Sequence, residues 1–229
     1  MTASTAKTLL ITGASSGIGA QTARQAVKAG WKVALVARRA DKLDDVVREL
    51  GNDNALALSC DVQSFEDQTA AVKRTLDTFG RLDAVFANAG RGGGPGGYSE
   101  GDPAMWRDLI LTNIYGLALT IRASAAALKA SNGSLIITSS IAGRRTIPGS
   151  VYGMTKWAAT AIGNNVREEF AGAGVRVTLI EPGMVDTPFF DEAKPNALKP
   201  EDVAATVMFA LDMPARGNIN ELVVVPTNR

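Results

Sequence analysis

Short apolar runs alternate regularly with longer stretches of helical periodicity, and this pattern constrains the fold more than any other feature of the 229 residues. The runs are rich in Val, Leu and Ile with little polar alternation, as is typical of strands buried on both faces of a parallel sheet. The predicted strands are Thr8–Ile11, Lys32–Ala37, Ala55–Ser59, Ala84–Ala87, Ser134–Thr138, Arg176–Ile180 and Leu222–Val225. The predicted helices are Gly17–Ala29, Asp41–Leu50, Phe65–Phe79, Pro103–Ala130, Val151–Ala171 and Pro200–Leu211. The alternation predicts an α/β fold with a doubly wound, seven-stranded parallel sheet and helices on both faces.

No Pro/Ser-rich linker or internal repeat divides the chain, so residues 1–229 are expected to form a single domain. The segment Arg91–Gly101 contains six glycines and one proline, too many to pack as helix or strand. It follows a predicted strand directly. Two interpretations are open: a flexible surface loop, or a mobile rim on a ligand crevice.

The composition excludes several protein classes. A net charge of +1 argues against a nucleic-acid surface, and no stretch of about 18 uninterrupted apolar residues suggests a membrane span. The polar segment Met1–Lys7 does not resemble a signal peptide. The single cysteine, Cys60, cannot form an internal disulfide and is expected to be buried and inert. A cytoplasmic protein is therefore predicted.

The sequence contains no histidine, which excludes Ser-His-Asp triads, Cys-His dyads and most catalytic zinc sites. No metal site is expected. Acid–base chemistry near neutral pH is left to a carboxylate, a lysine, a cysteine or a tyrosine.

A glycine-rich turn, Thr12–Gly19, joins the first predicted strand to the first helix. Glycines there permit a tight turn and close backbone approach to a phosphate, and the helix N-terminus offers free N–H groups. The turn predicts a dinucleotide site, against the alternative of a purely structural turn. Its binding residues are expected to be Gly13, Ser15, Ser16, Gly17, Ile18 and Gly19.

The second strand ends in Ala37-Arg38-Arg39, where sites for NAD usually carry an acidic residue. A carboxylate would repel a 2′-phosphate, whereas a guanidinium offers it charge and paired donors. The pair Arg38 and Arg39 therefore favours NADP(H), although one of the two could simply be a solvated turn residue.

Tyr152 and Lys156 lie four residues apart in a predicted helix, so both project from one face. An unperturbed tyrosine ionises near pH 10. A neighbouring ammonium favours the phenolate and is expected to lower this pKa toward the working range. The pair follows the fifth strand, which ends beside the presumed crevice.

With these residues the sequence resembles the short-chain dehydrogenase/reductase family over essentially its whole length. The matching motifs occur in the family's order: Thr12–Gly19, Asp61-Val62, Asn88-Ala89-Gly90, Asn113, Ser139-Ser140, Tyr152-x-x-x-Lys156 and Pro182-Gly183. The resemblance implies a Rossmann-type domain.

The resemblance also implies roles for the catalytic candidates. Tyr152 would transfer the substrate hydroxyl proton, and Lys156 would lower its pKa and hold the nicotinamide ribose. Ser140 would bind the substrate oxygen, and Asn113 would support a water-linked proton relay. The family's usual spacing would select Ser139 instead, but the Ser-x-x-Gly pattern that ends at Gly143 favours Ser140.

The remaining family positions imply cofactor contacts. Asp61 and Val62 would bind the adenine, and Arg38 matches the position used by members that take NADP(H). The other implied contacts are Asn88, Ala89, Gly90, Tyr152, Lys156, Pro182, Gly183, Val185 and Thr187.

The predicted function is that of an NADP(H)-dependent oxidoreductase interconverting a secondary alcohol or hydroxy acid and its carbonyl form. Phe189 and Phe190 in the short segment Pro188–Leu198 suggest an open or apolar substrate pocket. Arg144 and Arg145 could meet a substrate anion or form a solvated turn. A non-catalytic dinucleotide sensor and a family epimerase or dehydratase are the alternatives. The resemblance implies a homodimer or homotetramer.

Overall fold

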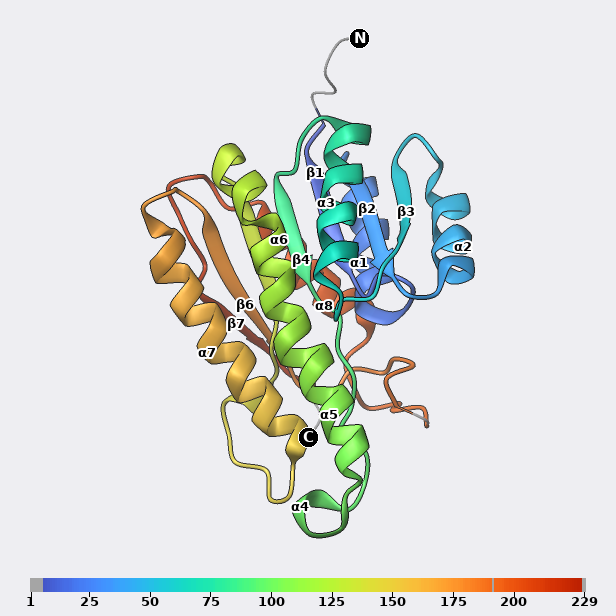
Figure 1. Cartoon of the computed structure of the whole chain (residues 1–229), viewed down its shortest axis with the longest axis vertical. Helices are drawn as coiled ribbons and strands as arrows, with labels where there is room; N and C mark the ends of the chain where they lie inside the picture. The colour runs from blue at the N-terminus through green and yellow to red at the C-terminus, as the bar shows by residue number, and fades with distance from the viewer. Residues whose placement is uncertain (1–5, 191, 228–229) are drawn as a thin grey trace.

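Figure 1 shows the computed structural model, which describes residues 6–190 and 192–227. Residues 1–5, which include most of the segment compared above with a signal peptide, lie outside the described residues. Seven parallel strands form one sheet in the order β3-β2-β1-β4-β5-β6-β7. The strands are β1 (Thr8–Thr12), β2 (Lys32–Ala37), β3 (Ala55–Ser59), β4 (Ala84–Ala87), β5 (Ser134–Thr138), β6 (Arg176–Pro182) and β7 (Glu221–Val224). The predicted fold class is confirmed.

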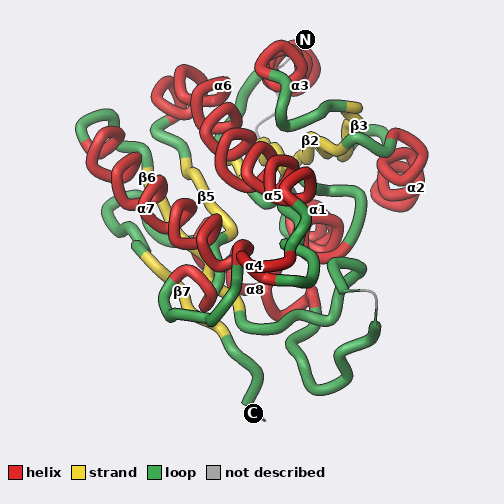
Figure 2. Tube along the Cα trace, turned by 60° about the horizontal axis from the view of Figure 1, so that its bottom comes forward, coloured by secondary structure: helices red, strands yellow, loops and turns green. Residues whose placement is uncertain are grey.

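The helices cover both faces of this sheet. They are α1 (Gly17–Lys28), α2 (Ala40–Leu50), α3 (Phe65–Phe79), α4 (Gly97–Glu100), α5 (Pro103–Ile110), α6 (Gly116–Ser131), α7 (Val151–Ala171) and α8 (Pro200–Leu211), with a π-helical turn η1 (Leu111–Tyr115) and a 3₁₀ turn η2 (Ile141–Gly143). One apolar cluster joins α1, α2 and α8 to the sheet, and a second joins α3, α6 and α7 to the opposite face. Figure 2, seen from the side that carries α4, shows the strands between these two layers.

Burial explains why the central strands lack polar alternation. All five residues of β1 are buried, because helices cover both of its faces. At the edge, β7 alternates between exposed and partly buried residues. The strand order reverses between β1 and β4, so the loops after these strands diverge to opposite sides. This divergence leaves a crevice at the carboxyl ends of the strands.

The predicted helix over Pro103–Ala130 is not regular throughout. It runs as α5, the π-helical turn η1 and then α6, which ends at Ser131. A π-turn inserts an extra residue into the helical ladder and often marks a functional position. Hydrophobic periodicity does not reveal it, since the flanking turns keep nearly the same helical face.

The prediction that Arg91–Gly101 contains neither helix nor strand is wrong at one point, because the segment includes the short helix α4. Gly96, with φ of 90°, turns the chain into this helix. The Tyr98 ring packs against Trp106 of α5 with centroids 6.2 Å apart. The high glycine content of the segment therefore did not predict α4, which packs on α5 through Tyr98 and Trp106.

The run Pro103–Ser131 is long and apolar enough, by composition, to cross a membrane, and 44% of its most apolar window is buried inside the protein. Its contacts with α3, β4 and α7 place it in a helix layer over the sheet. A core helix passes the same test of length and composition, so the run is weak evidence for a membrane span.

The N-terminus of α7 provides a test of how the helix is held in place. The Ser150 hydroxyl accepts a hydrogen bond from the Gly153 N–H at 2.8 Å. Ser150→Ala is expected to lower the free energy of unfolding by about 1 kcal/mol, because it leaves that donor without its cap. Urea unfolding measures the change, and Ser150→Asp, which keeps an acceptor oxygen, is the control. Equal midpoints for the wild type and Ser150→Ala would contradict this account.

Candidate active site

A cavity of about 550 Å³ opens at the carboxyl ends of the strands, where the strand order reverses. Most of the predicted site residues line it: Gly13, Ser15, Ser16, Gly17, Ile18, Arg38, Arg39, Asp61, Val62, Asn88, Ala89, Gly90, Ser140, Tyr152, Lys156, Pro182, Gly183, Val185 and Thr187. The predicted residues Gly19 and Asn113 do not line it. The fold thus gathers segments from the whole chain around one cavity.

The loop between β1 and α1 requires its glycines. Gly13 and Gly17 have φ of 69° and 54°, in the left-handed region that favours glycine. A Cβ on Gly19 would lie 2.5 Å from the Gly13 carbonyl oxygen, so Gly19 lets α1 pack closely on the loop instead of lining the cavity. The Ser16 side chain does not cap α1. The first N–H groups of the helix therefore remain available to an anion.

The two arginines after β2 lie at the same end of the cavity as this loop. Arg38 and Arg39 both line it, and the Arg39 guanidinium donates a hydrogen bond to Ser15 Oγ at 3.2 Å. Both side chains are exposed, and no acidic residue occupies the end of β2. The positive charge required by a phosphate monoester is thus present next to the glycine loop.

Asn88 ties three neighbouring strand ends together. Its Nδ2 donates to the Thr12 carbonyl at 3.1 Å, and its Oδ1 accepts from Thr138 Oγ1 at 3.2 Å. Next to it, the Thr12 hydroxyl accepts hydrogen bonds from the backbone N–H groups of Asn88 and Ala89. These contacts hold the ends of β1, β4 and β5 together at the floor of the cavity.

Tyr152 and Lys156 project from the first turns of α7 into the cavity. The Lys156 Nζ donates to the Thr138 carbonyl at 2.8 Å and lies 5.7 Å from the centroid of the Tyr152 ring. The same ring meets Phe189 edge-on, with centroids 5.6 Å apart. The phenol ring therefore has both a cation and an aromatic side chain as neighbours.

The pKa values of this pair differ from the sequence-based expectation. Burial raises the pKa of Tyr152 to about 12, and a hydrogen bond with Ser140 only partly offsets that rise. Burial also lowers the pKa of Lys156 to about 8. The expected lowering of the Tyr152 pKa by the ammonium is not found, because Lys156 directs its Nζ at a backbone carbonyl and desolvation of the phenol dominates.

The two adjacent serines at the end of β5 face different partners, as the strand geometry predicts. Ser139 is buried, donates to the Lys156 carbonyl at 3.2 Å and shares a hydrogen bond of 2.7 Å with the Thr160 hydroxyl. Ser140 donates to the Pro182 carbonyl at 3.4 Å and is the serine that contacts Tyr152. Ser140 therefore stays the preferred catalytic candidate.

Asn113 is buried in the π-helical turn, and its side-chain amide is committed to its neighbours. Its Oδ1 accepts from the Arg91 N–H, and its Nδ2 donates to the Arg91 carbonyl and to Thr155 Oγ1. The side chain thus fixes the start of the glycine-rich segment against α7. Its expected part in a proton relay is not visible in these side-chain contacts.

Three residues that sequence reasoning did not assign to the site also line the cavity: Cys60, Thr112 and Thr138. Cys60 and Thr138 lie at the carboxyl ends of strands, which was the available signal, whereas Thr112 lies in η1. Phe189 and Phe190, expected beside the substrate, line the cavity as well. The Cys60 thiol is buried and its pKa is raised to about 12 by desolvation, which agrees with an inert cysteine. No group of three or more metal-ligating side chains occurs in residues 6–190 and 192–227.

Of the glycine-rich segment, Arg91 lines this cavity, and Gly92 and Gly93 lie beside residues that line it. A Cβ on Gly93 would lie 3.1 Å from the Tyr152 backbone nitrogen, and one on Gly92 would lie 3.5 Å from the Phe189 ring. Arg91, which starts the segment, forms an ion pair with Asp108 of α5. Of the two interpretations of Arg91–Gly101, these contacts favour the rim.

A model of the family described as short chain dehydrogenase matches residues 7–197. The chain belongs to this family. An oxidoreductase of Staphylococcus aureus, described as uncharacterized, is 36% identical over 231 residues, covering 99% of this chain and 100% of the relative. The chain is thus an oxidoreductase of the short-chain dehydrogenase family, and the resemblance stated from its motifs is confirmed.

Solved structures of other family members superpose closely on this short-chain dehydrogenase. An alcohol dehydrogenase from Thermococcus sibiricus, complexed with 5-hydroxy-NADP, has a TM-score of 0.90 and 31% identity over 97% of each chain. A 3-ketoacyl-(acyl-carrier-protein) reductase from Brucella melitensis, complexed with NADH, has a TM-score of 0.87 and 28% identity over 95% of this chain and 96% of the other. Both neighbours bind a nicotinamide dinucleotide, and the two dinucleotides differ.

The lowered pKa of Lys156 predicts how stability depends on pH. Folding disfavours the charged ammonium of Lys156, so the unfolded chain binds more protons than the folded chain between pH 8 and about 10.5. The free energy of unfolding therefore rises with pH in that window. Below pH 8 the buried ammonium lowers the free energy of unfolding by its full amount, about 3 kcal/mol from the size of the pKa shift. Lys156→Met is therefore expected to be more stable than the wild type at pH 7, by a margin that shrinks toward pH 10.

Urea unfolding of both proteins without dinucleotide, at pH 7, 8, 9 and 10, measures that margin. Lys28→Met, which changes an exposed lysine, should differ from the wild type by a small and constant amount. A margin for Lys156→Met that does not change with pH would show that the buried ammonium carries no such cost.

Proposed function

We propose that this protein is an NADP(H)-dependent alcohol dehydrogenase or carbonyl reductase that uses Tyr152 as its acid–base. The observation that carries the proposal is that Tyr152, Ser140 and Lys156 line the same cavity as the glycine loop. A binding-only protein would need the loop alone. The constellation also supplies a group that can move a proton.

The cavity residues fit a nicotinamide dinucleotide. The β1–α1 loop packs directly on the residues after β4, since a Cβ on Gly13 would lie 2.9 Å from the Ala89 Cα, and its Gly13, Ser15, Ser16 and Gly17 line the cavity. The uncapped N-terminus of α1 would hold the pyrophosphate, and Asp61 and Val62 would flank the adenine. Pro182 and Gly183, which also line the cavity, would lie beside the nicotinamide. When bound, the cofactor supplies or accepts the hydride.

Tyr152 would hold the proton that the substrate oxygen gains during carbonyl reduction. With a pKa of about 12 the phenol is protonated at neutral pH, which suits an acid. Alcohol oxidation requires the phenol to lose this proton first, so oxidation should accelerate as the pH rises. The contact with Ser140 favours the phenolate and would share the developing charge.

Arg38 and Arg39 support the preference for NADP(H). The two neighbours described above bind different dinucleotides, so the choice rests on residues of this chain. Guanidinium groups attract a 2′-phosphate, and an acidic residue that would repel it is absent from the end of β2.

The substrate would be a ketone or secondary alcohol with an apolar or aromatic substituent. Phe189 packs on Tyr152 and Phe190 packs on Phe189, with ring centroids 5.6 and 5.2 Å apart, and both phenylalanines line the cavity. Arg91 is the charged side chain nearest in sequence to the rim glycines, and it is already paired with Asp108. An uncharged substituent therefore fits this end better than a carboxylate.

A homodimer or homotetramer in the cytoplasm is part of the same proposal. Apolar side chains are exposed on η1 and α7, the elements that carry Asn113 and Tyr152: Tyr115, Met154 and Trp157. Such exposed apolar side chains favour contact with another protein surface.

Tyr152→Phe tests the proposed chemistry. NADPH oxidation and NADP reduction are followed by absorbance with a panel of ketones, aldehydes, hydroxy acids and secondary alcohols. The wild type is expected to turn over an apolar ketone, and Tyr152→Phe is expected to lose at least about a hundredfold in kcat because the proton donor is gone. NADPH binding, measured by fluorescence titration, should survive in the variant.

The matched control for this substitution is Tyr115→Phe, which removes a hydroxyl from an exposed tyrosine outside the cavity. It should keep wild-type turnover. Full activity in Tyr152→Phe would refute the mechanism, and wild-type protein that binds NADPH without turning over any member of the panel would favour a dinucleotide sensor.

Arg38→Ala tests the choice of dinucleotide. Loss of a charged hydrogen-bonding partner of the 2′-phosphate is expected to weaken NADPH binding about tenfold or more, while NADH binding changes little. Titration calorimetry with both dinucleotides measures the two affinities, with Arg145→Ala, outside the cavity, as the control. An equal loss for both dinucleotides would remove Arg38 from the phosphate site.

A further inference from the structure

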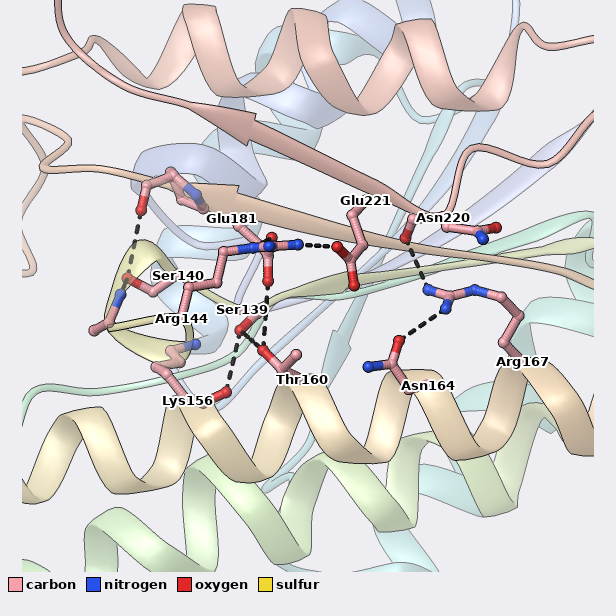
Figure 3. A network of polar contacts seen from close by, with 12 residues as sticks. Ser139, Ser140, Arg144, Lys156, Thr160, Asn164, Arg167, Glu181, Asn220 and Glu221 are labelled. Carbon is pink, nitrogen blue, oxygen red and sulfur yellow. Dashed lines mark hydrogen bonds and ion pairs between the residues drawn. The ribbon is translucent and has the colours of Figure 1, made fainter. Parts of the chain in front are cut away.

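One guanidinium joins three elements beside the candidate active site. Arg144 follows the turn η2 and forms ion pairs with Glu181 at the end of β6 and with Glu221 at the start of β7. Figure 3 shows it between the two carboxylates, above α7. Arg144 does not line the cavity, so a substrate anion, one of the two possibilities raised by the sequence, would not meet it there.

Glu181 is the unusual member of this group because its side chain is fully buried, whereas that of Arg144 is 38% exposed. A buried carboxylate is costly unless it is paired and hydrogen-bonded. Its two oxygens accept from Arg144 and, at 3.4 Å, from the Thr160 hydroxyl. Glu181 therefore depends on Arg144 for its counter-charge.

From Glu181 the contacts continue to the reacting groups by two routes. The Thr160 hydroxyl lies 2.7 Å from that of Ser139, which in turn lies 3.2 Å from the carbonyl of Lys156. The two hydroxyl protons serve two of the three contacts among Glu181, Thr160, Ser139 and the Lys156 carbonyl at any one time. Along the backbone, the residue after Glu181 is Pro182, whose carbonyl accepts from Ser140. Figure 3 shows both serines, Thr160 and Lys156 grouped around Arg144 and Glu181.

We propose that Arg144 is a positioning residue for hydride transfer, acting through Glu181. The ion pair fixes the end of β6 against η2 and α7, and so sets the places of Ser140 and of the turn that carries Lys156. This inference rests on the proposed function. Small displacements of reacting groups reduce turnover strongly, by about a hundredfold for 1 Å.

The test compares Arg144→Met, Glu181→Gln and the double variant, with Arg145→Met as the matched control on the neighbouring exposed arginine. Arg144→Met alone leaves a buried carboxylate without its counter-ion, and it is expected to melt at a lower temperature. The double variant removes both charges and should regain most of that melting temperature. It keeps the test valid even if Arg144→Met does not fold.

All three variants are expected to lose about tenfold to a hundredfold in kcat, with the KM for NADPH nearly unchanged, because each lacks the same contact. The loss in the double variant should equal that in the single variants and not their product. Arg144→Lys keeps the charge without the two-sided guanidinium contact, and should recover part of kcat. Arg145→Met should match the wild type.

A folded double variant with wild-type kcat would overturn the proposal, as would an effect on KM alone. A second readout does not need turnover: amide hydrogen exchange in residues 139–143 and 152–160 should accelerate in the double variant and not in Arg145→Met. Unchanged exchange would also overturn it. If the wild type turns over no substrate, the proposed function fails, while the exchange data still decide the role of Arg144.

Discussion

The ends of β1 and β4 and the start of α1 approach one another so closely that two positions must lack a side chain. A Cβ on Gly13 would meet Ala89, and a Cβ on Gly19 would meet the Gly13 carbonyl. Asn88 then joins this junction to β5 through Thr138. Because all strands are parallel, this one edge also receives the ends of β5 and β6. The close approach creates the cavity floor, and the loops that diverge from it form the walls.

Burial is the second constraint, and it acts on the charges of the site. The same desolvation raises the pKa of Tyr152 and lowers that of Lys156, so a neutral phenol lies beside an ammonium that the fold disfavours. On the other side of Ser139, a fully buried Glu181 depends on Arg144. Charged groups of this kind do not maximise stability, and their concentration around one cavity agrees with a site selected for chemistry.

The sequence predicted most of the sheet and the helices, because buried parallel strands and long helices have distinct local periodicities. It failed where particular side-chain contacts, and not residue type and spacing, fix the backbone conformation. The π-helical turn around Asn113 depends on Arg91 and Thr155, and α4 depends on the packing of Tyr98 against Trp106. Neither has a local signal, since hydrophobic spacing and glycine content describe only near neighbours in the chain.

By itself the sequence determined the fold class, the glycine loop and the Tyr152–Lys156 pair, because each depends on residue type and short spacing. Because the sequence contains no histidine, it also indicated that few groups other than Tyr152 could carry acid–base chemistry. Only the tertiary structure decided which serine contacts Tyr152, that the Asn113 amide bonds Arg91 and Thr155, and that Arg144 pairs with Glu181. It also reversed the expected pKa shift of Tyr152. These properties depend on burial and on distances between segments far apart in the chain, which periodicity and motif spacing do not contain.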